Sequence, residues 1–215
     1  MKIINIDKHK RRSDNMKTKA EILVKDLSSN PAKNYTIEQT EDLARRVLRD
    51  CEFDNIIGAT PIVKIANCFG FSCLKAENMP DDISGNIFIG GTTELLYNTS
   101  KVIIVGNNEE YAHQRFIIAH ELAHYFIDYI GSPEFKNPNL LFSKTYPKIN
   151  HSSDEEIRAD RFAAELLMPS ELFLRKYIKA MEASDFNKKY IVSYLATFFK
   201  TKKSSIIKRI DEVIS

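Results

Sequence analysis

Two histidines four residues apart enclose a glutamate in the segment His120-Glu121-Leu122-Ala123-His124. Positions i and i+4 lie on one face of an α-helix, so both imidazoles can bind the same metal ion. Glu121 lies about 100° further around such a helix, beside that ion, where its carboxylate can accept a proton from a water molecule. The spacing therefore predicts a hydrolytic metal centre with His120 and His124 as ligands and Glu121 as general base.

The residues around this segment distinguish a metal centre from a surface helix that carries two histidines by chance. The neighbours are apolar on nearly every side of the expected helix, which indicates that the helix is buried. These neighbours are Phe116, Ile117, Ile118, Leu122, Ala123, Phe126 and Ile127. Because buried histidine and glutamate side chains need polar partners or a metal ion, the pattern favours the metal centre.

A third metal ligand is expected on a separate element, since a catalytic zinc ion normally has three protein ligands and one open position. Glu156 and Asp160 follow downstream at i, i+4 spacing. Glu156 can supply the third ligand, and Asp160 can orient a ligating histidine through its other ring nitrogen. The alternative for Glu156 is an acid that only stabilises the N-terminus of its own helix, as its neighbour Glu155 can do.

Two blocks of sequence resemble a known family. They are RFIIAHELAHYF, which contains the two histidines, and EEIRADRFAAELLMP, which begins at Glu155. The second block is the more distinctive, with Ala159-Asp160, then Phe-Ala-Ala and Leu-Leu-Met-Pro. Together they resemble the ImmA/IrrE family of zinc metallo-endopeptidases over residues 40–200. The family pattern often has glycine at the position of Ala123, a departure that does not affect ligation.

The resemblance implies that Zn²⁺ is bound by His120, His124 and Glu156 and that Glu121 is the general base. It also implies a protein substrate, because known members of the family cut helix-turn-helix repressors of phage, mobile-element or stress-response genes. The residue that stabilises the oxyanion stays undecided between His113, Tyr146 and His151.

The elements that position these residues follow from apolar periodicity, helix caps and chain breaks. Helices are expected at 36–48, 62–68, 109–130, 154–168, 170–181, 188–200 and 204–214, and strands at 71–77, 85–90 and 101–105. Residues 131–152 contain three prolines and are expected to be irregular. The predicted fold class is α+β, a small zincin-like metalloprotease that is mostly helical, with a three-stranded sheet and an HExxH active-site helix.

Charge is distributed unevenly along the 215 residues, although the formal net charge is only +2. Residues 1–20 and 188–215 each carry a net +5, which leaves −8 for residues 21–187. Three regions are therefore expected: a basic, flexible N-terminal arm at 1–34, a zinc metallopeptidase domain at 35–185, and a basic helical hairpin at 186–215 that packs on it.

Other interpretations stay open. Residues 195–210 also fit a helix-turn-helix, so a non-catalytic DNA-binding or regulatory protein with a structural metal site is the alternative function. A different HExxH hydrolase, such as a deformylase, would require Cys68 or Cys73 as a ligand. No apolar run reaches the length of a membrane helix and the three cysteines form no CxxC pair, so a cytoplasmic protein without a membrane partner is expected.

Overall fold

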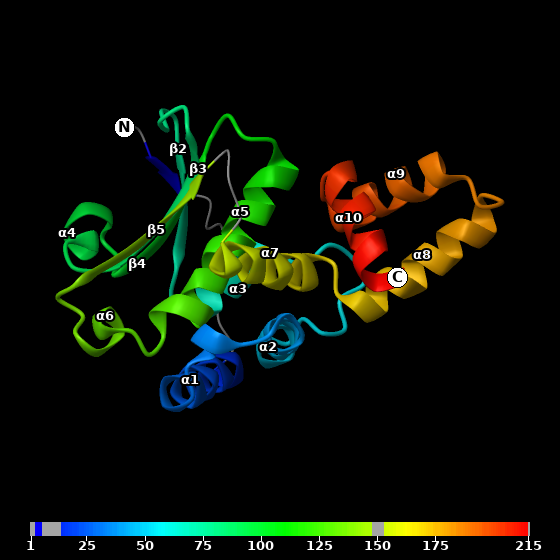
Figure 1. The fold of residues 1–215 in the computed structure, drawn as a ribbon. Helices are drawn as coiled ribbons and strands as arrows, with labels where there is room; N and C mark the ends of the chain where they lie inside the picture. The colour runs from blue at the N-terminus through cyan, green and yellow to red at the C-terminus, as the bar shows by residue number, and fades with distance from the viewer. Residues whose placement is uncertain (1–2, 6–13, 148–152, 215) are drawn as a thin grey trace.

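A computed structural model describes residues 3–5, 14–147 and 153–214 of the chain (Figure 1). A twisted sheet occupies one side of the molecule, and helix α5 (Tyr111–His124) packs on it through strands β3 and β4. Helix α7 (Asp154–Leu167) packs against α5, and helix α2 (Ile37–Asp50) packs against α7. The fold is thus α+β and mostly helical, as the sequence predicts.

The sheet has more strands than the three expected. Its order is β1-β2-β4-β3-β5; β2 and β4 are parallel, and the other neighbouring pairs are antiparallel. The expected strands correspond to β2, β3 and β4, whereas β1 and β5 are additions at the two edges. The bounds are β1 Ile3–Asn5, β2 Ser72–Ala76, β3 Ile83–Gly90, β4 Lys101–Gly106 and β5 Leu141–Pro147.

Strand β4 separates two apolar layers because successive side chains of a strand point to opposite faces. Ile103 and Val105 belong to the main core, whereas Val102 and Ile104 join a smaller cluster. On the α5 side, Gly85 of β3 allows close approach, because a Cβ atom there would overlap the Ile117 side chain. Helix α5 therefore packs closely against the sheet at this position.

Helices make up most of the remaining chain, and most lie close to their predicted bounds. A capping box between Thr36 and Gln39 starts α2, as its sequence suggests. The predicted helix at 109–130 divides into α5 and a π-helical turn, Tyr125–Tyr129. The other helices are α1 Asp14–Ser29, the short 3-10 turn Ala32–Asn34, α3 Ile62–Cys68, α4 Thr93–Tyr97, α6 Pro133–Lys136, α8 Ser170–Ala183, α9 Lys188–Phe199 and α10 Lys203–Ile214.

The prediction of a flexible arm at 1–34 is wrong for its second half. Residues 14–29 form helix α1, which buries Ala20, Leu23 and Leu27 in the main core. These three residues recur at helical spacing, and their burial offsets the cost of ordering a segment rich in lysine. Residues 6–13 of the expected arm lie outside the described residues.

The segment 131–152 is also more regular than expected. Ser132 caps the short helix α6, and β5 follows it and pairs with β3 along its length. Only two of the seven β5 residues, Phe142 and Tyr146, are buried, so the strand presents a weak apolar pattern. Residues 148–152 lie outside the described residues.

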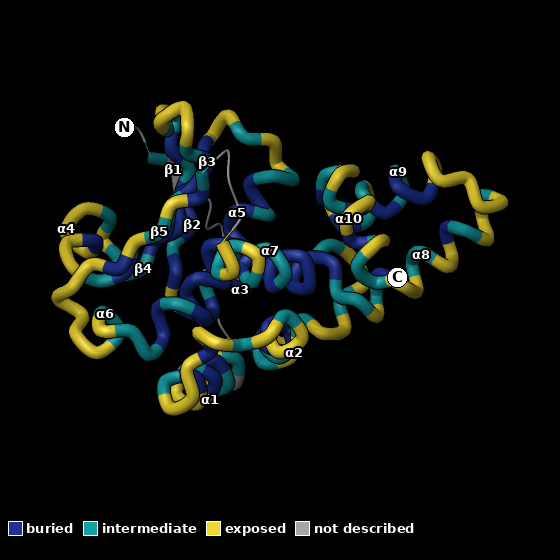
Figure 2. Tube along the Cα trace, viewed as in Figure 1, coloured by how far each residue is buried: buried dark blue, intermediate teal, exposed yellow. Residues whose placement is uncertain are grey.

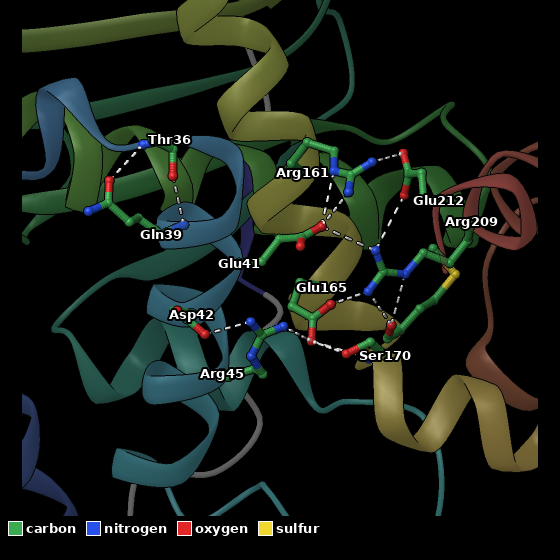
Figure 3. Close-up of polar contacts among 11 residues, drawn as sticks. Thr36, Gln39, Glu41, Asp42, Arg45, Arg161, Glu165, Ser170, Arg209 and Glu212 are labelled. Carbon is green, nitrogen blue, oxygen red and sulfur yellow. Dashed lines mark hydrogen bonds and ion pairs between the residues drawn. The ribbon is translucent and has the colours of Figure 1, made fainter. Parts of the chain in front are cut away.

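A buried group of charged residues joins the C-terminal helices to the rest of the chain (Figure 3). Arg209 of α10 is 1% exposed and pairs with Glu165 of α7, which is 0% exposed. Arg209 also donates hydrogen bonds to the Met168 carbonyl oxygen at 3.1 and 3.2 Å. From α2, Arg45 Nη1 lies 3.0 Å from Glu165 Oε1. One carboxylate therefore connects three helices.

The interior is concentrated where α5, α7 and the sheet meet. Figure 2 shows α5 and β4 largely buried, while the connections around α8 and α9 are exposed. Helices in the described ranges are all too short or too polar to cross a membrane.

Candidate functional site

Three potential metal donors meet where α5 packs on α7. His120 and His124 stand on one face of α5, and their Nε2 atoms lie 3.1 Å apart. The Glu156 carboxylate of α7 lies 3.0 Å from His120 Nε2 and 3.4 Å from His124 Nε2. One donor atom from each residue lies within 4.8 Å of the others. The arrangement suits a single metal ion held by two imidazole nitrogens and a carboxylate.

The start of α7 fixes the position of Glu156. Ser153 caps the helix, and its hydroxyl oxygen accepts a hydrogen bond from the Glu156 amide at 3.3 Å. This bond places Glu156 at the third position of the helix, where its side chain turns toward α5. The adjacent Glu155 instead pairs with Lys144 of β5 at 2.9 Å and takes no part in the group of donors.

A carboxylate contacts the Nδ1 atom of each histidine, on the side of the ring that faces away from the group of donors. His120 Nδ1 lies 3.0 Å from Asp160 Oδ1, and His124 Nδ1 lies 2.6 Å from Asp128 Oδ2. A carboxylate only accepts hydrogen bonds, so both Nδ1 atoms carry the proton in neutral imidazole. The Nε2 lone pairs of His120 and His124 then point to the space they share with Glu156, as ligation requires.

Asp128 is a residue that the sequence analysis missed. It lies four residues after His124, in the π-helical turn, so the i, i+4 series on this face continues past the second histidine. That spacing is the signal that could have revealed it. Lys144 Nζ lies 3.7 Å from Asp128 Oδ2, which adds a positive charge at the rear of the site.

Glu121 is fully buried beside the three donors. Neither carboxylate oxygen has a hydrogen-bond partner within the described residues. Burial raises the pKa of Glu121 to about 8, with Glu156 adding to the shift and His120 opposing it. The backbone of Tyr146 also opposes the rise in this pKa. A group with this pKa can hold or release a proton near neutral pH.

The two histidines differ in their affinity for protons. Burial lowers the pKa of His120, but its hydrogen bonds to Asp160 and Glu156 outweigh burial and raise that pKa to about 9. Burial dominates for His124 and lowers its pKa, although Asp128 opposes the change. In the metal-free protein, the donor group therefore holds its proton on His120, between the ring and Glu156.

A small cavity lies next to the donors. Its volume is about 160 Å³, and Tyr146 of β5, which forms part of its wall, packs edge-on against His120 with ring centroids 4.7 Å apart. The remaining wall comes from α5 and from the start of α10 and the turn before it: Ala112, His113, Phe116, Thr201, Lys202 and Ser205. The C-terminal hairpin therefore borders the site.

The structure separates the three candidates for oxyanion stabilisation. Tyr146 contacts His120 directly, and burial raises the pKa of its hydroxyl, so the hydroxyl remains a hydrogen-bond donor. His113 lines the same cavity, but its Nδ1 lies 2.7 Å from Glu109 Oε2. His151 lies outside the described residues. Tyr146 is thus the candidate closest to the donors among those described.

The cysteines do not contribute to the donor group. Cys51, Cys68 and Cys73 form no disulfide and are buried in the main apolar core, and the group of donors in the described residues contains His120, His124 and Glu156. The described residues therefore contain no deformylase-like donor group with a cysteine ligand.

Comparisons with known proteins assign the chain to a family. Residues 89–211 match the model of the IrrE N-terminal-like domain, peptidase family M78. The match covers more than half of the chain, and the chain belongs to this family. No curated protein matches it. Membership supports a peptidase, a hydrolase of peptide bonds, and the two histidines with Glu156 form a group able to bind a metal ion.

Among solved structures, the chain is similar to a Mycobacterium tuberculosis transcriptional regulator, with 16% sequence identity and a TM-score of 0.49. The similarity covers 90% of this chain and 51% of that one, so the chain spans about half the length of the regulator.

Proposed function

We propose that this chain is a zincin-like, zinc-dependent endopeptidase that hydrolyses a peptide bond in a protein substrate. The observation that carries the proposal is the convergence of His120, His124 and Glu156 beside the unpartnered carboxylate of Glu121. Two histidines and a glutamate are a ligand set of catalytic zinc sites in peptidases. Membership of a peptidase family is in accord with it.

His120, His124 and Glu156 would hold the zinc ion. When bound, zinc polarises the carbonyl of the scissile bond and makes a neighbouring water molecule more acidic. Glu121 accepts the proton of the attacking water and returns it to the leaving amine. Its burial and its raised pKa suit both transfers, because the protonated form is not strongly disfavoured near neutral pH.

Strand β5 and the small cavity offer a place for the substrate chain. β5 is the outermost strand of the described sheet on the side of the site, and an extended peptide can pair with such an edge. Tyr146 on this strand packs on His120 and would donate a hydrogen bond to the oxyanion. A side chain flanking the scissile bond would enter the cavity between His113 and Lys202.

The proposed substrate is a helix-turn-helix repressor, and the proposed location is the cytoplasm, where such a repressor acts. The support is the resemblance of the two sequence blocks to a family whose known members cut these repressors. The basic C-terminal hairpin would contact the repressor or its DNA. Direct DNA binding by this chain is the lesser alternative, since Arg209 of the hairpin is buried against Glu165 rather than presented outward.

The test uses Glu121→Gln, Glu156→Ala and, as matched control, Glu155→Gln. Each purified variant is assayed for bound zinc and for cleavage of a helix-turn-helix repressor encoded beside the gene. Glu121→Gln should keep zinc and lose cleavage by at least about 100-fold, Glu156→Ala should lose both, and Glu155→Gln should resemble the wild type. Full cleavage by Glu121→Gln would refute the peptidase mechanism and favour the non-catalytic regulatory alternative.

A further inference from the structure

A second cavity, of about 320 Å³, lies on a different face of α5. It is formed where the start of α3 and strand β2 meet the N-terminal half of α5. Arg115 points to this cavity from a position five residues before His120, which is about 140° away around the helix. The cavity is therefore distinct from the group of metal donors and from the small cavity beside them.

Arg115 is a buried cation without an anionic partner. Its side chain belongs to a residue that is 5% exposed, and its Nε and Nη2 atoms have no hydrogen-bond acceptor within the described residues. Tyr111 compensates in part, because its polar side chain opposes the effect of burial on the pKa of Arg115 and its ring lies 5.9 Å from the guanidinium carbon. Burial lowers the pKa of Arg115. A guanidinium group in this position gains most from an acceptor that comes from outside the chain.

Two lysines add to the positive charge of the cavity. Lys64 at the start of α3 and Lys75 of β2 line it together with Arg115, and the lining includes no aspartate or glutamate. No ion pair joins these three cations to an acid in the part of the chain that the structure describes. The cavity therefore carries three positive charges with no negative charge in its wall.

We infer that this cavity is a binding site for a small phosphorylated molecule. Arginine presents a planar fork of N–H donors that matches two phosphate oxygens, and the free Nε and Nη2 form one edge of that fork. Lys64 and Lys75 supply point charges for the remaining oxygens. The apolar walls from Ile62 and Ile118, and the exposed ring of Tyr111, accommodate the organic part of the ligand.

The size and charge of the cavity favour a small phosphate ester over other anions. A volume of about 320 Å³ is at the lower end of the range for small-molecule sites, so a phosphate with a compact organic group fits. A monocarboxylate would neutralise only one of the three cations. Duplex DNA would reach the exposed Lys64 but not the buried guanidinium of Arg115.

The test is isothermal titration calorimetry of the full chain in phosphate-free buffer, with inorganic phosphate, adenosine 5′-monophosphate, acetate and a short DNA duplex as separate probes. The wild type should bind one phosphate probe per chain and should bind acetate at least about tenfold more weakly. Arg115→Met should weaken phosphate binding by at least about tenfold, since two charge-assisted hydrogen bonds are lost.

A second variant, Lys75→Ala, tests the proposal if Arg115→Met folds poorly. Lys75 is partly exposed, so its replacement should not prevent folding. This variant should weaken phosphate binding several-fold, whereas Lys179→Glu, an exposed change on α8, should leave it unchanged. Each variant is checked by circular dichroism. The proposal is overturned if neither phosphate probe binds saturably, if Arg115→Met and Lys75→Ala bind as the wild type does, or if only DNA binds.

Discussion

Replacing Asp128 should weaken metal binding even though Asp128 is not a ligand. Its carboxylate accepts the Nδ1 proton of His124 at 2.6 Å and so keeps the Nε2 lone pair directed at the donor group. In Asp128→Ala, both imidazole tautomers become accessible, and the tautomer with its proton on Nε2 cannot bind the ion. In Asp128→Asn an acceptor remains, but its negative charge is lost.

The expected loss of zinc affinity follows from the burial of His124 and Asp128 and from the distance between them. His124 is 2% exposed, and the Asp128 side chain is 9% exposed, so water cannot readily replace the lost acceptor. Carboxylates that orient a metal-bound histidine typically contribute 10- to 100-fold to metal affinity, about 1.4 to 2.7 kcal/mol. Because the contact between Asp128 and His124 is short, Asp128→Ala should weaken zinc binding about 100-fold and Asp128→Asn about 10-fold. Asp160→Asn should weaken zinc binding less than the Asp128 changes do, because the Asp160 side chain is 19% exposed.

The assay is competition for zinc against a chelator of known affinity at fixed pH. Asp154→Asn is the matched control, since it removes one negative charge from the exposed first turn of α7 without touching either histidine. Circular dichroism verifies folding of each variant. A folded Asp128→Ala protein with zinc affinity within about twofold of the wild type would refute the argument that His124 depends on this carboxylate.

Three further predictions concern pH and stability. The pKa of His120 in the metal-free protein is raised to about 9, so a bound ion must displace a proton from this ring. Zinc affinity, measured by competition with a chelator, should therefore rise about tenfold per pH unit between pH 7 and 8.5. A zinc affinity that does not change with pH over this range would contradict the prediction. Arg209→Met removes a buried partner of Glu165 and should lower the free energy of unfolding, measured by urea denaturation, by about 2–4 kcal/mol. An unchanged midpoint of the urea unfolding curve would contradict this prediction. Gly85→Ala forces a Cβ atom against Ile117 and should cost about 1–3 kcal/mol by the same measurement, whereas Gly58→Ala, in open space, should cost almost nothing.

The central residues of the site could be proposed from sequence because their spacing is a property of one helix. His120, Glu121 and His124 need only the helical period to be related in space. Glu156 lies on a different helix and reaches the site through a tertiary contact, so its prediction depends on the rule that a catalytic zinc ion has a third protein ligand. Asp128 lies four residues after His124, so the helical period relates it to the site in the same way.

Parts of the fold had weaker local signals. Strand β5 has an exposed edge and buries only Phe142 and Tyr146, so it lacks the β-branched run that makes β4 evident. Helix α1 was obscured by its charge, since its six charged residues outnumber the three apolar residues that it buries, Ala20, Leu23 and Leu27. The π-helical turn after α5 depends on packing around Tyr125 and Phe126, which no local period encodes. Tertiary contacts therefore decided each of these elements.

The charged contacts of Arg209 also bear on when the peptidase becomes complete during synthesis. Arg209 reaches back 44 positions to Glu165 and 168 positions to Glu41. As the chain leaves the ribosome from its N-terminus, α7 emerges before α10. Until α10 has emerged, the partners of Glu165 among the described residues are Arg45 and Ser170. Helix α7, which carries Glu156, thus gains its contact with Arg209 only after α10 has been synthesised, so the group of donors is less well supported in a chain that ends before α10.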